Sequence, residues 1–322
     1  MRILVTGGAG YLGSVLVRRL LQEGHEITVV DKGYYGLKSL KKLPILLIKK
    51  DVQSIRSLKN IDVLIHLASI VGDAACRLSP GQTVRTNVYM TEHLAKLCKK
   101  HNVKMVYAST CSVYGKTDRI VSERVKPRPA SLYGWSKLFS ENIIRNGGCD
   151  YVILRLGTLF GMSHRMRFDL AVNLFIAKAL SGEMITVYGG QQYRPFLHVK
   201  DAAEAFSRAI DWRRGIYNVA LTNFQIIDVA KAIAEYFGVA YGVIEGIKDE
   251  RDYIVSLKKS KRRFMPRRGL DAACAEIENA YDFGIWKNYK KSEYSNHKAL
   301  FKDIEFMKRV YTLGPILPHD EM

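Results

Sequence analysis

Tyr133 and Lys137 are the residues of this sequence whose types and spacing best suit acid–base chemistry. A spacing of four residues on a helix places both side chains on one face, a turn apart. A free phenol has a pKa of about 10, and a neighbouring ammonium favours the phenolate, so Tyr133 is a candidate general base. Thr110, which directly follows an apolar run, offers a hydroxyl that would hydrogen-bond the same substrate oxygen. Tyrosine and lysine at this spacing are common, so the interpretation depends on the elements around them.

A glycine-rich turn near the N-terminus predicts a binding site for a dinucleotide. An apolar run over residues 1–6 precedes the turn, and apolar residues at helical spacing follow it over 14–22. In this context the first glycine allows a tight turn, the second lets the backbone approach a pyrophosphate, and the third packs the helix on the strand. The free N–H groups of the helix N-terminus would face the phosphates. The turn residues are Gly7, Gly10, Tyr11, Leu12 and Gly13. Glycine turns also join strands to helices without a ligand, so this alternative stays open.

Two acidic residues follow the next two predicted strands. Strand 26–30 ends at Asp31, about 20 residues past the glycines, where a carboxylate accepts hydrogen bonds from the adenosine ribose and repels a 2′-phosphate. Asp31 therefore favours NAD over NADP, and the alternative is an acidic residue that caps a turn. Strand 45–50 ends at Asp51 and Val52, where a carboxylate would meet the adenine amino group.

The remaining N-terminal elements predict an α/β fold with a Rossmann-type, doubly wound parallel sheet. Strand 61–69 contains His66, which we expect to be a core histidine, and helix 84–100 contains Asn87. The small side chains that end this strand, over which a cofactor would lie, follow Leu67 and are Ala68 and Ser69. Strand 103–108 leads directly to Thr110, at the carboxyl edge where doubly wound sheets bind ligands.

The sequence resembles the extended short-chain dehydrogenase/reductases, in particular the NAD-dependent nucleotide-sugar epimerase/dehydratase family and its UDP-glucose 4-epimerase-like members. The resemblance covers about residues 1–285, and the matching stretches are residues 6–13, 31, 51–52, 66–69, 87, 109–115, 133–137, 154–161, 172–174 and 194–201. It implies catalytic roles for Thr110, Tyr133 and Lys137. It also implies an NAD site that includes Leu67, Ala68, Ser69, Asn87 and Lys137.

The resemblance also predicts the domain organisation. Residues 1–160 would form the NAD-binding domain, to which 194–220 return, and a smaller C-terminal α/β domain over 161–193 and 221–322 would bind a nucleoside diphosphate sugar. Two helices, over 86–100 and 133–145, would pair with a second copy, so the resemblance implies a homodimer.

The residues after Thr110 bear on the reaction. Sugar 4,6-dehydratases of the family carry Asp-Glu there, whereas this chain has Cys111 and Ser112, which favours 4-epimerases. Cys111 as an acid or base is one interpretation, and a small packed thiol is the other. Thr158 stands where galactose epimerases of the family carry an asparagine that contacts the sugar phosphates.

Further substrate contacts are expected from the second half of the chain. In the family the loop over 161–169 lies over the sugar, so His164 and Arg165 are candidate contacts, against the alternative of a charged surface loop. The candidates for the diphosphate and the nucleobase are Asn173, Arg194, Arg251 and Tyr188.

Composition narrows the class of protein. The 322 residues carry a net charge of +19, which suits an anionic ligand or a solvated basic face, and no nucleic-acid motif accompanies it. An odd number of cysteines, five, without C-x-x-C spacing favours reduced thiols, and no apolar run is long enough to span a membrane. We expect a cytoplasmic protein.

The sequence therefore predicts an NAD-dependent 4-epimerase of a nucleoside diphosphate sugar, acting through a 4-keto intermediate. A reductase or dehydrogenase of the same fold, which would consume cofactor, is the first alternative. A catalytically silent, NAD-sensing regulator that binds nucleic acid is the second.

Overall fold

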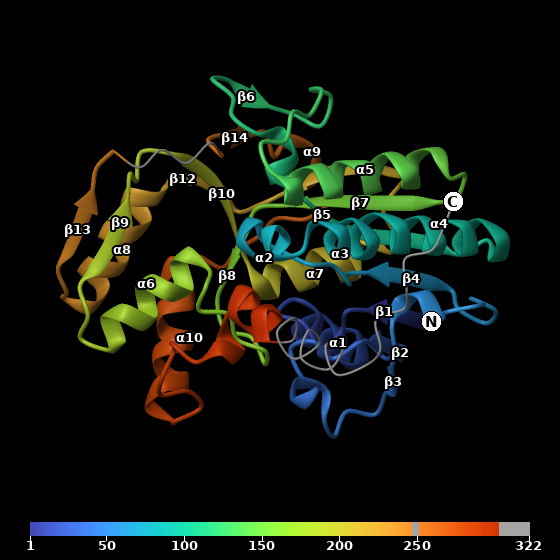
Figure 1. Cartoon of the computed structure of the whole chain (residues 1–322), viewed down its shortest axis with the longest axis horizontal. Helices are drawn as coiled ribbons and strands as arrows, with labels where there is room; N and C mark the ends of the chain where they lie inside the picture. Colours follow the sequence, from blue (N-terminus) through green and yellow to red (C-terminus); the bar gives the residue numbers. More distant parts are fainter. Residues whose placement is uncertain (247–250, 303–322) are drawn as a thin grey trace, which may run out of the picture.

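The protein is built on one large parallel sheet, as the computed structural model shows for residues 1–246 and 251–302 (Figure 1). The strand order is β11-β7-β5-β4-β1-β2-β3, and every neighbouring pair is parallel. The strands are β1 (Arg2–Thr6), β2 (Glu26–Asp31), β3 (Leu46–Lys49), β4 (Val63–His66), β5 (Lys104–Thr110), β7 (Tyr151–Leu156) and β11 (Gly215–Val219). The predicted α/β class and doubly wound sheet are confirmed.

Helices cover both faces of this sheet, because its strands are apolar on both sides. Ile3 and Val5 of β1 share a core cluster with α1 (Gly13–Gln22) and α7 (Val199–Ala209). Leu4, which points to the other face, packs with residues of α4 (Met90–His101) and α5 (Leu132–Asn146). The sheet is thus the middle layer of three (Figure 1).

From β1 the sheet continues to β2 and β3 in one direction, and to β4, β5 and β7 in the other. Doubly wound sheets bind their ligands at the point between the two halves, which here lies between β1 and β4. Thr6 and His66 end the adjacent strands β1 and β4 there. The His66 ring bonds to Thr6 Oγ1 at 2.7 Å and to Thr91 Oγ1 at 3.0 Å. Burial lowers the pKa of His66 to about 3, so the ring is neutral. This confirms that His66 is a satisfied core histidine.

The helix predicted over 84–100 is longer and less regular than expected. It consists of α3 (Pro80–Val84), a π-helical turn η3 (Arg85–Tyr89) and α4. Within the π turn, the carbonyl of Asn87 accepts hydrogen bonds from the hydroxyls of Thr91 and Ser140, at 2.7 and 2.6 Å. Side chains therefore satisfy a carbonyl in the irregular turn, and periodicity alone does not reveal this.

A group of smaller sheets and helices lies outside these three layers, beside the carboxyl edge of the main sheet. It comprises the sheets β12-β10-β8, β13-β9 and β14-β6. The strands are β6 (Ile120–Val121), β8 (Thr158–Phe160), β9 (Ile185–Tyr188), β10 (Tyr193–His198), β12 (Thr222–Gln225), β13 (Tyr241–Ile244) and β14 (Ile254–Val255). The helices that accompany them are α6 (Ala171–Leu180), α8 (Ile226–Phe237), α9 (Lys258–Lys261) and α10 (Leu270–Asp282). The short helix α2 (Asp73–Leu78) packs instead against α3 and α5.

The predicted domain boundaries remain a prediction. β11, within the segment predicted to return to the first domain, pairs with β7 in the main sheet. Residues 247–250 and 303–322 of the predicted second domain lie outside the described residues.

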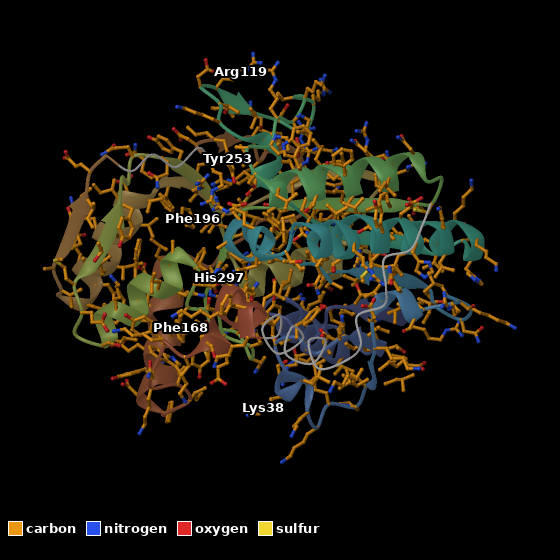
Figure 2. The ribbon with its side chains drawn as sticks, in the orientation of Figure 1. Lys38, Arg119, Phe168, Phe196, Tyr253 and His297 are labelled. Atoms are coloured by element: carbon orange, nitrogen blue, oxygen red, sulfur yellow. The ribbon has the colours of Figure 1, made fainter. Side chains whose placement is uncertain are left out.

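Across 1–246 and 251–302, no helix combines the length and apolar character that crossing a bilayer requires. Lys38 and Arg119, labelled in Figure 2, are charged side chains on the periphery, at opposite edges of the molecule.

Candidate active site

A cavity lies at the carboxyl edge of the main sheet, where the glycine turn, the ends of the central strands and the start of α5 meet. It brings together eighteen of the predicted site residues. These are Gly7, Gly10, Tyr11, Leu12, Gly13, Asp31, Asp51, Val52, Leu67, Ala68, Ser69, Thr110, Ser112, Tyr133, Lys137, Thr158, Arg165 and Arg251. The cavity is therefore shared between the predicted NAD residues and the predicted catalytic residues.

The glycine turn is shaped for the close approach of a ligand. Gly7 has φ +75°, and a Cβ at this position would lie 2.6 Å from the backbone nitrogen of Ala68. A Cβ on Gly13 would overlap the carbonyl oxygen of Gly7. Asp31 accepts hydrogen bonds from Ala9 N at 2.9 Å and Gly33 N at 2.8 Å, so its carboxylate is held at the cavity wall. This turn and carboxylate fit the phosphates and adenosine ribose of a dinucleotide.

Thr110, Tyr133 and Lys137 converge on the same part of the cavity. Thr110 ends β5, and its hydroxyl accepts a hydrogen bond from Ser112 N at 3.1 Å. Tyr133 lies in the first turn of α5, which begins after the N-cap Ser131. Lys137, only 2% exposed, donates to Ala108 O at 2.8 Å.

The titration behaviour of this group differs from the sequence expectation. Burial lowers the pKa of Lys137 to about 7, whereas burial raises the pKa of Tyr133 above its ordinary value. The Thr110 hydroxyl opposes this increase, and the Lys137 ammonium is directed at Ala108. The polypeptide by itself therefore does not produce the lowered phenol pKa that the Tyr133–Lys137 spacing suggested.

A buried ion pair supports the catalytic strand from behind, and sequence reasoning missed it. Arg155 of β7 and Glu141 of α5 approach to 2.6 Å with almost no exposure. Ser109, which precedes Thr110, donates to Glu141 Oε1 at 2.5 Å. Glu141 lies one turn beyond Lys137, so the helical spacing was a usable signal. The pair ties β5, β7 and α5 together beneath the cavity.

Cys111, a predicted substrate-site residue for which an acid or base role was one interpretation, lies outside the cavity, which corrects that placement. It is fully buried, and its thiol donates to the carbonyl of Arg155 at 3.2 Å. Burial raises its pKa above the ordinary thiol value. The packed-thiol interpretation therefore holds, because the turn after β5 directs the side chain toward β7 and into the core.

Two predicted asparagines also lie outside the cavity and hold loops instead. Asn87 accepts from Ile70 N at 2.8 Å and donates to Ser136 Oγ at 2.9 Å. Asn173 accepts from Gly161 N at 2.9 Å and donates to the Tyr11 hydroxyl at 3.1 Å. Their amides are used within the protein, so neither is placed to bind a cofactor or a diphosphate directly.

The other predicted substrate residues outside the cavity are His164, Tyr188 and Arg194. His164 is exposed in its loop, and Tyr188 on β9 is 55% exposed at the far end of the group of smaller sheets. Arg194 of β10 is buried with its guanidinium 5.3 Å from the ring centroid of Tyr253, a residue labelled in Figure 2. Tyr253 does line the cavity and bonds to Ser112 Oγ at 3.2 Å, so Arg194 stands behind the wall.

Sequence reasoning also missed several residues that line the cavity. They are Tyr34, Tyr35, Arg167, Tyr253 and Asn296. Tyr34 and Tyr35 lie shortly after Asp31, so they were within reach of the Rossmann pattern. Asn296 carries no local signal, because it reaches the cavity from a segment more than a hundred residues beyond Arg165, its hydrogen-bond partner.

The fold and site together define a Rossmann-type, NAD-dependent enzyme class, and comparison with known proteins gives the family. The model of the NAD dependent epimerase/dehydratase family matches residues 3–220. The chain therefore belongs to this family, and NAD is the cofactor of the family.

Two curated relatives illustrate the range of activities among similar proteins. An uncharacterized UDP-glucose epimerase of Bacillus subtilis is 33% identical over 235 residues, or 65% of this chain and 72% of the relative. UDP-glucuronic acid decarboxylase 1 of Xenopus tropicalis is 34% identical over 216 residues, which is 62% of this chain. The match spans about half of that decarboxylase, 51% of its length.

Solved structures agree with this assignment. MoeE5 in complex with UDP-glucose and NAD has a TM-score of 0.76 at 29% identity, covering 89% of this chain and 100% of that chain. UDP-glucose 4-epimerase of Thermotoga maritima with UDP-glucose has a TM-score of 0.79 at 25% identity, with coverages of 89% and 100%. The chain is thus similar in fold and sequence to NAD-dependent enzymes that act on nucleotide sugars.

Proposed function

We propose that the protein is a 4-epimerase of a nucleoside diphosphate sugar, with a uridine diphosphate sugar as substrate. One observation carries the proposal: Thr110, Tyr133 and Lys137 line the cavity, and the acidic residues among its described lining, Asp31 and Asp51, belong to the dinucleotide end. A 4,6-elimination needs carboxyl groups at the positions that Cys111 and Ser112 occupy. The similarity to a 4-epimerase that was solved with UDP-glucose supports the same reaction.

The side chains of this cavity suit removal of a proton from a sugar hydroxyl. Tyr133 Oη, as phenolate, accepts the proton of the 4-hydroxyl and later returns it. Thr110 Oγ1 holds the substrate oxygen in line with the phenol. Once NAD is bound, the cationic nicotinamide ring, together with Lys137 in its charged form, would favour the phenolate against the effect of burial. Bound NAD supplies reversible acceptance of the C4 hydride, so the ketone is reduced on either face without net consumption of cofactor.

Decarboxylation of a UDP-uronic acid is the second candidate, because decarboxylases are among the similar proteins. It begins with the same oxidation at C4, since a 4-keto uronic acid carries its carboxyl β to the ketone and loses CO₂. The cationic Arg251 lines the cavity, bonded to Asp73 at 2.7 Å, and is a candidate contact for a carboxylate. A reductase or dehydrogenase of the same fold would use the same Thr110, Tyr133 and Lys137, and would differ by consuming cofactor in each turnover.

The first experiment tests cofactor retention and the role of Tyr133 together. Protein is purified without added cofactor and denatured, and the released NAD and NADH are quantified by mass spectrometry. We expect near-stoichiometric cofactor, and we expect Tyr133→Phe to keep this cofactor while losing turnover. The control is Tyr236→Phe, which removes an exposed phenol on α8, far from the cavity lining. An empty protein that exchanges cofactor freely would favour the reductase or dehydrogenase.

We also propose a homodimer formed through α4 and α5. Trp135 and Phe139, one turn apart on α5, are 47% and 54% exposed, and Tyr89 before α4 is 58% exposed. Large exposed aromatics on neighbouring helices fit a protein–protein interface. Light scattering during gel filtration tests this, since Phe139→Glu should shift the protein toward monomer.

A further inference from the structure

Arg165 is a buried cation whose hydrogen bonds are incomplete. It is 7% exposed and lines the cavity. Its Nη1 donates to Asn296 Oδ1 at 2.6 Å, and its guanidinium lies 4.2 Å from the ring centroid of Tyr35. Within the described part of the chain, Nε and Nη2 have no hydrogen-bond partner. Buried donors without acceptors are costly, which suggests that a ligand supplies the missing acceptors.

The neighbouring arginine shows the contrast. Arg167 directs Nε and Nη2 at the two carboxylate oxygens of Asp169, each at 2.9 Å. The Asp169 carboxylate therefore neutralises the charge of Arg167. Arg165 lies close enough to Arg167 for the two positive charges to repel each other. Burial, followed by Arg167, lowers the pKa of Arg165 to about 10. An anion in the cavity would stabilise the charged guanidinium of Arg165 and so raise its pKa again.

The position of Arg165 identifies which end of the cavity that anion occupies. The loop that carries it is fixed to the glycine turn, because Ser163 Oγ donates to Tyr11 O at 2.6 Å and contacts Ser14 Oγ at 3.0 Å. The Arg165 backbone N–H donates to this same Ser163 hydroxyl at 3.3 Å. Arg165 also interacts electrostatically with Asp31 at the end of β2. These are the elements of the dinucleotide site, and they surround the N-terminus of α1.

We propose that Arg165 binds the diphosphate of the dinucleotide, opposite the backbone N–H groups of the α1 N-terminus. This assignment moves Arg165 from the sugar, where its loop suggested a contact, to the cofactor. A planar guanidinium with two free donors matches two phosphate oxygens. The helix N-terminus provides the complementary donors on the inner side. The inference rests on the proposed placement of NAD in the cavity and is independent of which sugar reaction follows.

The segment after α10 holds Arg165 in this position. Asn296 receives the guanidinium hydrogen bond, and its backbone N–H donates to Asp169 Oδ2 at 3.1 Å. Leu300, fully buried, packs with Ile70 and Cys76 on the other side of the cavity wall. In Figure 1 this red segment lies beside α1, and His297 within it is labelled in Figure 2. The second half of the chain thus contributes to retention of the cofactor.

The test compares Arg165→Gln with Arg18→Gln. Arg18 lies on α1, outside the cavity lining, and its loss changes the net charge equally. Full-length protein with its bound NAD is mixed with excess isotopically labelled NAD, and the exchange rate is followed by mass spectrometry. We expect Arg165→Gln to exchange about 10- to 100-fold faster, which corresponds to losing hydrogen bonds to a charged group. Arg18→Gln should exchange as the wild type does.

A second measurement separates the diphosphate from the rest of the cofactor. ADP-ribose and AMP each compete with bound NAD, and only ADP-ribose carries a diphosphate. We expect Arg165→Gln to weaken the binding of ADP-ribose by a similar factor. The affinity for AMP should stay within about twofold of the wild-type value. Unchanged exchange with a raised KM for the sugar nucleotide would overturn the proposal and assign Arg165 to the substrate. An equal loss of affinity for AMP would also overturn the proposal. So would a lowered melting temperature that accounts for the faster exchange. None of these outcomes changes the expectation for Tyr133→Phe.

Discussion

Thr110, at the end of β5, and Tyr133, in the first turn of α5, line the same cavity, and the Thr110 hydroxyl acts to lower the pKa of the Tyr133 phenol. The sheet therefore presents a hydroxyl, and the helix presents a phenol, to one point in the cavity. Burial raises the pKa of the phenol, and the Thr110 hydroxyl opposes this increase. The catalytic base consequently depends on a neighbour that belongs to a different element.

Thr110→Val should lower kcat by about 10- to 100-fold, because it removes the hydroxyl that aligns the substrate oxygen and assists the phenolate. The acid limb of the pH–rate profile should move to higher pH, since the hydroxyl that lowers the Tyr133 pKa is lost. Steady-state kinetics across pH measure both effects. Thr110→Ser, which keeps the hydroxyl, is the control and should stay within a few-fold of wild type. An unshifted acid limb in the valine variant would contradict this role.

Lys137→Met should alter the pH dependence of stability. The buried ammonium has a pKa of about 7 in the folded chain, against 10.5 for an ordinary lysine. Between these values the unfolded chain binds more protons, so the free energy of unfolding of the wild type rises with pH. The variant lacks this rise. Its stability relative to wild type should be greatest below pH 7 and fall by on the order of several kcal/mol toward pH 10.

Urea unfolding at pH 6, 8 and 9.5 measures this difference. Lys96→Met, which removes an exposed lysine on α4, should show a difference that is flat with pH. A flat difference for Lys137→Met as well would mean that the ammonium is not destabilised by burial.

Glu141→Gln should destabilise the fold by about 3–5 kcal/mol, because it leaves the buried Arg155 guanidinium without its anion. Glu92→Gln removes an exposed carboxylate paired with Lys96 and should cost no more than about 1 kcal/mol. Denaturant unfolding gives both values. Comparable losses in the two variants would show that the buried pair contributes little to holding β5, β7 and α5 together.

Gly13→Ala should lower the NAD content of the purified protein, since its Cβ would overlap the Gly7 carbonyl and displace α1 from the turn. Gly269→Ala is the matched control, because a Cβ there has open space around it. Cofactor released on denaturation, per folded chain, is the measurement. Full NAD occupancy in Gly13→Ala would be incompatible with the tight approach in the structure.

The sequence was sufficient for the parts of the site that depend on local patterns. The glycine turn, Asp31 and the spacing of Tyr133 and Lys137 are each defined within one strand–turn–helix unit, and all line the cavity. Thr110 was predictable because a parallel strand must end at the ligand-binding edge. Periodicity and turn chemistry act over a few residues, so they locate such groups well.

The sequence was insufficient where a role depends on packing between distant elements. Cys111 and Asn173 lie in matching stretches, but the direction of their side chains is set by β7 and by Tyr11. Arg165 and Asn296 meet across more than a hundred residues, and no periodic pattern links them. Tertiary structure, not local preference, therefore decided which charged residues reach the cavity.

The most direct test of the proposed 4-epimerase is product analysis without added NAD. Purified protein is incubated separately with UDP-glucose and UDP-glucuronic acid, and the products are identified by proton NMR while absorbance at the NADH band is recorded. We predict that the C4 epimer of one of these substrates forms, with no CO₂ released and no net NADH. Formation of a UDP-pentose with release of CO₂, or steady accumulation of NADH, would contradict the account.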